Sequence, residues 1–73
     1  MGERIRPMVN EKFRILKQNI KNTPACDLSK SQLYDVSFMM TREQLKEYAK
    51  LLHDKGIVSY EYGHAYIGNK ELY

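Results

Sequence analysis

The chain has 73 residues and a formal net charge of +3 at pH 7, with 42% hydrophobic and 29% charged residues. This length holds one domain with a modest core, and no apolar run approaches the roughly 20 residues that a membrane-spanning helix needs. The single cysteine excludes an internal disulfide and, with only two distant histidines, forms no zinc-binding spacing. The N-terminus is charged throughout, so we expect no signal peptide. We therefore expect one cytoplasmic domain over residues 1–73, without a metal or cofactor.

Positive charge is concentrated at the N-terminal end. Residues 1–22 contain six basic and two acidic side chains and so carry +4, whereas the remainder is close to neutral. Residues 1–8 are expected to form a short basic arm before a helix from about Asn10 to Asn22, with Asn10 as a candidate cap. Helical spacing places the apolar side chains of Phe13, Leu16 and Ile20 on one face. The other face contains Lys12, Arg14, Lys17 and Lys21, which suit an ordinary solvated surface as well as a binding patch.

A second helix is predicted from Lys30 to Phe38. Pro24 ends the first helix, because a proline disfavours helical geometry in the residue before it. In the loop that follows, Cys26 is expected to be a buried or half-buried small residue rather than a reactive thiol, because nothing basic flanks it. Ser29 and Gln32 have the spacing of a capping box, which gives the helix its start signal.

The segment 37–40 turns the chain into a third helix without a glycine, and its two methionines are expected to fill gaps in the core. Thr41 and Gln44 repeat the capping-box spacing. Gly56 suits the left-handed position that follows a helix end. The third helix is therefore predicted from Arg42 to Lys55. Its apolar stripe consists of Leu45, Tyr48, Ala49 and Leu52.

Charged side chains divide the exposed face of this third helix into two arcs. At about 100° per residue, the basic arc contains Arg42, Lys46, Lys50 and His53. The acidic arc beside it contains Glu43, Glu47 and Asp54. The basic arc is the part that can contact phosphate. Pairing between the two arcs would instead make the helix an ordinary salt-bridged surface.

After Gly56 the apolar period changes from 3.6 to 2, which predicts a two-stranded hairpin. The first strand covers residues 57–62 and the second covers residues 65–67. Gly63 and His64 lie between them and have the order of a type II′ turn, with glycine first.

The tyrosines of the first strand, Tyr60 and Tyr62, share one strand face, so we expect them to pack on the helices rather than to offer a stacking surface to bases. Residues 68–73 can finish a strand, form a single helical turn or contribute to a dimer contact, and the sequence does not distinguish these three alternatives.

The order helix, helix, helix, hairpin resembles the small winged helix-turn-helix DNA-binding domains that are common in archaea and their viruses. The resemblance extends over residues 13–73 and rests on the SKSQ start of the second helix, the run QLKEYAKLLHDKGIV, and the tyrosine-rich strands. It implies an α+β fold with three helices followed by a two-stranded β-hairpin wing. It also implies that the third helix lies in the major groove while the wing contacts the adjacent backbone or minor groove.

The resemblance implies DNA contacts from two helices and the wing. Arg42 is the best candidate for a base or phosphate contact because a guanidinium binds bidentately, whereas Lys46 and Lys50 position the backbone. Hydroxyls and free N–H groups at the start of the second helix bind a phosphate, and His64 makes a contact at the wing tip. The candidate DNA-binding residues are Ser29, Lys30, Ser31, Thr41, Arg42, Glu43, Lys46, Lys50 and His64.

We therefore expect a nucleoid-associated transcriptional regulator that binds double-stranded DNA as a homodimer, since one small domain covers only a half-site. The alternative is a winged-helix protein–protein interaction module without DNA binding, which the glutamates on the third helix favour because they repel phosphate. An enzyme is not expected, because the sequence contains no glycine-rich phosphate loop, HExxH motif or nucleophile elbow, and its six tyrosines are scattered. Neither a membrane nor a small-molecule substrate is expected as a partner.

Overall fold

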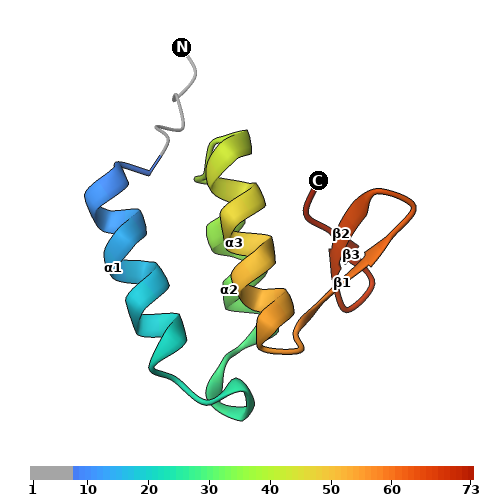
Figure 1. Cartoon of the computed structure of the whole chain (residues 1–73), viewed down its shortest axis with the longest axis horizontal. Helices are drawn as coiled ribbons and strands as arrows, with labels where there is room; N and C mark the ends of the chain where they lie inside the picture. The colour runs from blue at the N-terminus through green and yellow to red at the C-terminus, as the bar shows by residue number, and fades with distance from the viewer. Residues whose placement is uncertain (1–7) are drawn as a thin grey trace.

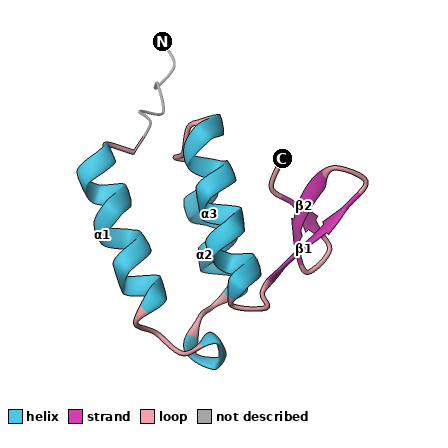
Figure 2. Cartoon of the chain, in the orientation of Figure 1, coloured by secondary structure: helices cyan, strands magenta, loops and turns pink. Residues whose placement is uncertain are grey.

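The computed structural model describes residues 8–73, so the predicted basic arm lies outside the described residues apart from Met8. Three α-helices are followed by a three-stranded antiparallel sheet, an α+β fold compatible with a winged-helix topology (Figure 1, Figure 2). In Figure 1, α3 stands between α1 and the sheet, with α2 behind it. The elements are α1 (Asn10–Lys21), η1 (Ala25–Asp27), α2 (Lys30–Ser37), α3 (Arg42–Asp54), β1 (Val58–Glu61), β2 (His64–Ile67) and β3 (Lys70–Glu71).

Local capping signals account for the starts of α2 and α3. The capping box at Thr41 is complete: the Gln44 backbone N–H donates to Thr41 Oγ1 at 3.1 Å, and the Thr41 N–H donates to Gln44 Oε1 at 3.1 Å. At α2, the Gln32 N–H donates to Ser29 Oγ over a longer 3.4 Å. Gly56 follows α3 with a φ of +80°, the left-handed geometry expected there. All three α-helices end one residue before the predicted position.

The start of α1 differs from the prediction. Val9 occupies the cap position and makes no side-chain hydrogen bond to the helix. Asn10 is instead the first helical residue, and its Oδ1 accepts a hydrogen bond from Gln44 Nε2 at 3.3 Å. The Asn10 side chain therefore contacts α3 instead of capping α1, the role that its position in the sequence had predicted.

The hairpin turn lies one residue earlier than predicted. Val58 pairs with Ile67 and Glu61 with His64, so the two loop residues are Tyr62 and Gly63. Their φ angles of +51° and +81° are both positive, which is the type I′ pattern rather than type II′. A tyrosine in the left-handed region costs about 1 kcal/mol relative to glycine or asparagine. The register is set by the inward-facing apolar residues of the two strands, not by the preference of glycine for the first turn position.

The sheet has a third strand that the predicted two-stranded wing lacks. In β3, Lys70 pairs with Ile67 and Glu71 pairs with Tyr66. The pairing continues beyond the strand, because the Leu72 N–H donates to the Ala65 carbonyl oxygen at 2.7 Å. Residues 68–73 thus contain a short separate strand, Lys70–Glu71, rather than the end of the preceding strand or a helical turn.

The core lies where the three α-helices meet the sheet. Its buried apolar residues are Phe13, Ile20, Leu33, Met40, Tyr48, Ala49, Leu52, Val58, Ala65 and Ile67. Tyr48 is fully buried, as predicted, and its hydroxyl donates to the Leu33 carbonyl oxygen at 2.7 Å, which joins α3 to α2. Burial raises the pKa of the Tyr48 phenol above its ordinary value, because the charged form would be desolvated.

Four residues are more exposed than predicted. Met40 fills the core, but Met39 lies outside it and is 48% exposed. Cys26 is exposed within η1. Tyr60 contacts the ring of His53 on α3 but stays 43% exposed, and Tyr62 is 98% exposed, because the hairpin extends beyond the helices (Figure 1). Within β1, only Val58 is buried.

Candidate nucleic-acid interface

Gln44 holds the start of α3 against the start of α1. Its Nε2 donates to the Met8 carbonyl oxygen at 2.8 Å and to Asn10 Oδ1 at 3.3 Å, while its Oε1 accepts the Thr41 N–H. Gln44 is only 7% exposed, and both polar atoms of its carboxamide are hydrogen-bonded. Because a satisfied buried network specifies one arrangement, the N-terminal turn of α3 has a defined orientation relative to α1.

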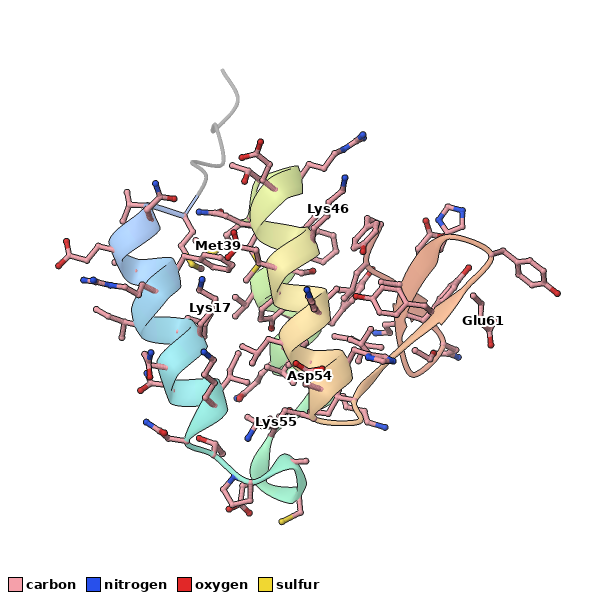
Figure 3. All side chains as sticks on the ribbon, viewed as in Figure 1. Lys17, Met39, Lys46, Asp54, Lys55 and Glu61 are labelled. Carbon is pink, nitrogen blue, oxygen red and sulfur yellow. The ribbon has the colours of Figure 1, made fainter. Side chains whose placement is uncertain are left out.

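The acidic flank of α3, defined as Glu43, Glu47 and Asp54, lies on the side of α1. Lys17 Nζ is 2.8 Å from Glu47 Oε1 and 4.8 Å from the centre of the Phe13 ring, so Lys17 bridges the two helices (Figure 3). Glu43 and Glu47 line a groove opposite Arg14 and Lys17. Glu47 and Asp54 line a second groove with Lys21 of α1, and Lys50 of α3 borders the same groove. The carboxylates of α3 therefore face the cations of α1, which offsets part of their negative potential.

The basic flank of α3, defined as Arg42, Lys46, Lys50 and His53, is exposed to solvent. Lys46 extends from α3 away from α1 (Figure 3). Among residues 8–73, Arg42, Lys46 and Lys50 take part in no ion pair. The N-terminus of α3 adds a partial positive charge beside Arg42. The flank thus presents three cations that no carboxylate of the described chain neutralises by direct contact.

His53 connects this basic flank to the sheet. Its ring lies 5.0 Å from the ring of Tyr60 on β1, with an interplanar angle of 49°. Partial desolvation raises the pKa of Tyr60, and a hydrogen bond with Tyr73 and the negative charge of Asp54 act in the same direction. The ring contact positions the hairpin beside α3.

His64 is not at the wing tip, where the sequence placed it. It is the first residue of β2, and its Nδ1 lies 3.0 Å from the Tyr73 carbonyl oxygen and 3.2 Å from Glu71 Oε2. These contacts hold the imidazole against β3, although half of its side chain stays exposed. Tyr62 and Gly63 form the tip instead.

The candidate phosphate contacts at the start of α2 lie apart from those of α3. Ser29 Oγ accepts the Gln32 N–H and is 3.2 Å from Ser31 Oγ, so both hydroxyls already have protein partners. Lys30 beside them is exposed. In Figure 1, α2 begins near the end of α3, whereas Arg42 lies at the opposite end. The structure therefore brings together Arg42, Lys46 and Lys50 but does not bring Ser29, Lys30 and Ser31 beside Arg42.

Two other candidates occupy the first turn of α3. Thr41 is exposed, but its Oγ1 serves as the helix cap and accepts the Gln44 N–H. Glu43 is exposed on the acidic flank. Sequence reasoning missed the contact of Gln44 with α1 and the ion pair between Lys17 and Glu47, because residues about 30 positions apart in the chain carry no local signal of contact.

No helix within residues 8–73 has the length and apolar character to cross a membrane. In the same part of the chain, no three histidine, cysteine, aspartate or glutamate side chains are grouped so that they could hold a metal ion. Comparison of the chain with protein-family models, with characterised proteins and with solved structures found no match.

Proposed function

We propose that this chain binds double-stranded DNA as a winged-helix domain and acts as a nucleoid-associated transcriptional regulator. In the bound complex, α3 lies in the major groove with Arg42 directed at base edges. Lys46 and Lys50 contact the phosphate backbone and position the helix.

The observation that carries the proposal is the separation of charge on α3. Arg42 and Lys46 are exposed and have no ion-pair partner among residues 8–73, whereas the acidic flank lies toward α1 together with Lys50, which lines the same groove as Glu47 and Asp54. Phosphate approaching from the outward side meets uncompensated positive charge first, so the electrostatic attraction that drives DNA association is available.

The rival function, a protein-docking winged helix, depends on the carboxylates of α3 being free to pair with a partner. Glu47 is already paired with Lys17 at 2.8 Å. Glu43 faces the groove that Arg14 also lines. This orientation toward α1 favours DNA over a basic protein partner as the ligand of the outward face.

We infer a homodimer on DNA, because one domain of this size spans a single half-site and two-fold pairing matches a palindromic site. Sedimentation of the protein with a half-site duplex and with a full-site duplex measures this directly. Two protomers on the full site and one on the half-site are expected, whereas a single protomer on both would exclude a homodimer.

Fluorescence anisotropy with a mixed pool of labelled duplexes tests the DNA-binding proposal. At low salt we expect a Kd in the micromolar range or below, and log K should fall steeply and linearly with log salt concentration as counterions are released. A folded protein that leaves the anisotropy unchanged at low salt would refute DNA binding and favour the protein-docking function.

A further inference from the structure

The hairpin tip has an aromatic side chain that contributes nothing to packing. Tyr62 is 98% exposed, which leaves both ring faces open to solvent. Its φ of +51° lies in the left-handed region, where the other positive φ angles of residues 8–73 belong to glycines. Asparagine, aspartate or glycine would form the same type I′ turn with less strain.

Neither the core nor the turn therefore explains a tyrosine at this position. Residues held in sparsely populated regions of φ and ψ are concentrated at active sites and ligand-contact sites. Tyr62 combines such strain with complete exposure, so the two observations together indicate a contact made outside the folded chain.

The chemistry of the tip favours stacking over phosphate binding. Residues 61–64 contain no lysine or arginine, and Glu61 at the end of β1 is exposed (Figure 3). His64 is held by the Glu71 carboxylate and the Tyr73 carbonyl oxygen. The phenol ring of Tyr62 is the remaining contact group, and a nucleic-acid base is the partner whose flat face such a ring stacks on.

The position of the tip relative to α3 suits this contact. Tyr62 lies four residues beyond Val58, which corresponds to about 13 Å along an extended strand. The ring contact between His53 and Tyr60 fixes the base of the hairpin beside the basic flank, and the hairpin projects from α3 on the side away from α1 (Figure 1). The tip therefore reaches DNA next to the segment that α3 would bind.

We infer that Tyr62 is an aromatic wedge that enters a base step of the bound duplex, stacks on one base and bends the DNA. The inference rests on the proposed function of DNA binding. Side chains that open a base step in this way bend duplexes by about 20–90°, so the contact has a signature separate from affinity.

The test uses the full chain, a duplex with 2-aminopurine substituted along its length, and a duplex labelled at both ends for energy transfer. Tyr62→Asn keeps the turn and removes the ring, whereas Tyr62→Phe keeps the ring. For the wild-type protein we expect 2-aminopurine fluorescence to rise at one step and energy transfer to increase. Tyr62→Asn should abolish both signals and weaken binding roughly tenfold, a typical loss for one base–aromatic stack. Tyr62→Phe should match the wild type.

Wild-type binding without a 2-aminopurine signal or a bend would overturn the wedge while leaving DNA binding intact. The same conclusion would follow if Tyr62→Asn bound and bent the duplex as the wild type does. If the wild-type protein bound no duplex at all, the proposed function would fail and the wedge with it.

Discussion

Replacing Gln44 with alanine tests whether the start of α3 is held in place by the carboxamide network. The substitution removes three hydrogen bonds, those to the Thr41 N–H, the Met8 carbonyl oxygen and Asn10 Oδ1. At about 1 kcal/mol net for each bond, less about 0.5 kcal/mol returned by the better helix propensity of alanine, the loss is about 2–3 kcal/mol. In a 73-residue domain, this lowers Tm by about 10–20 °C.

Urea unfolding followed by circular dichroism at 222 nm, a helix signal, would measure the change in free energy. Glu43→Ala is the matched control, because Glu43 is an exposed neighbour in the same helical turn, and its effect should stay within about 0.5 kcal/mol. If Gln44→Ala cost no more than the control, the network would not hold the two helices together and the reasoning would be wrong.

Three further changes address single contacts. Tyr48→Phe should cost about 1–2 kcal/mol, because it removes the buried hydrogen bond that the Tyr48 hydroxyl donates to the Leu33 carbonyl oxygen. The folded-state pKa of Tyr48 is raised above its unfolded-state value. The stabilisation from the neutral phenol is therefore complete below about pH 10 and is lost as the pH rises above the unfolded-state pKa. Measured by urea unfolding across this pH range, the free energy of unfolding of Tyr48→Phe should fall less steeply than that of the wild type. Tyr62→Asn should raise stability by about 0.5–1 kcal/mol, because asparagine tolerates a positive φ, and a loss of stability would show that the turn does not strain tyrosine. Lys17→Ala should weaken duplex binding several-fold in anisotropy titrations, because it leaves the negative charge of Glu47 without its ion-pair partner. Adding Glu47→Gln should restore the affinity, and no recovery would mean that Lys17 contacts DNA itself.

The local signals predicted most of the helical part of the fold. Thr41 and Gln44 form the predicted capping box, and Gly56 takes the left-handed conformation that ends α3. These features depend on residues three or four positions apart, so a single sequence contains the information. The same holds for Tyr48, whose place in the apolar stripe of α3 predicted its burial.

The sheet was predicted less well because its details depend on non-local pairing. A two-residue strand such as Lys70–Glu71 has no apolar alternation to mark it. The predicted position of the turn was wrong because Gly63 fits both the first position of a type II′ turn and the second position of a type I′ turn. The pairing register of β1 with β2 selects the second of these. The orientation of the charged flanks likewise depends on where α1 packs, which the spacing within α3 does not specify.

The most direct test of DNA binding compares two double variants that remove the same net charge. Arg42→Ala with Lys46→Ala removes cations from the basic flank. Lys12→Ala with Lys70→Ala removes cations on the side of α2, since Lys12 lines a groove with Val36 and Lys70 Nζ lies 5.1 Å from the centre of the Tyr34 ring.

Anisotropy titrations of the wild type and both variants should be repeated across a salt series, with circular dichroism to confirm folding. The basic-flank variant is expected to lose roughly 10- to 100-fold in affinity and to reduce the salt slope by about 2, whereas the control variant stays close to the wild type. Equal losses in the two folded variants would show that net charge alone drives binding, and unchanged affinity in the basic-flank variant would contradict the role of α3.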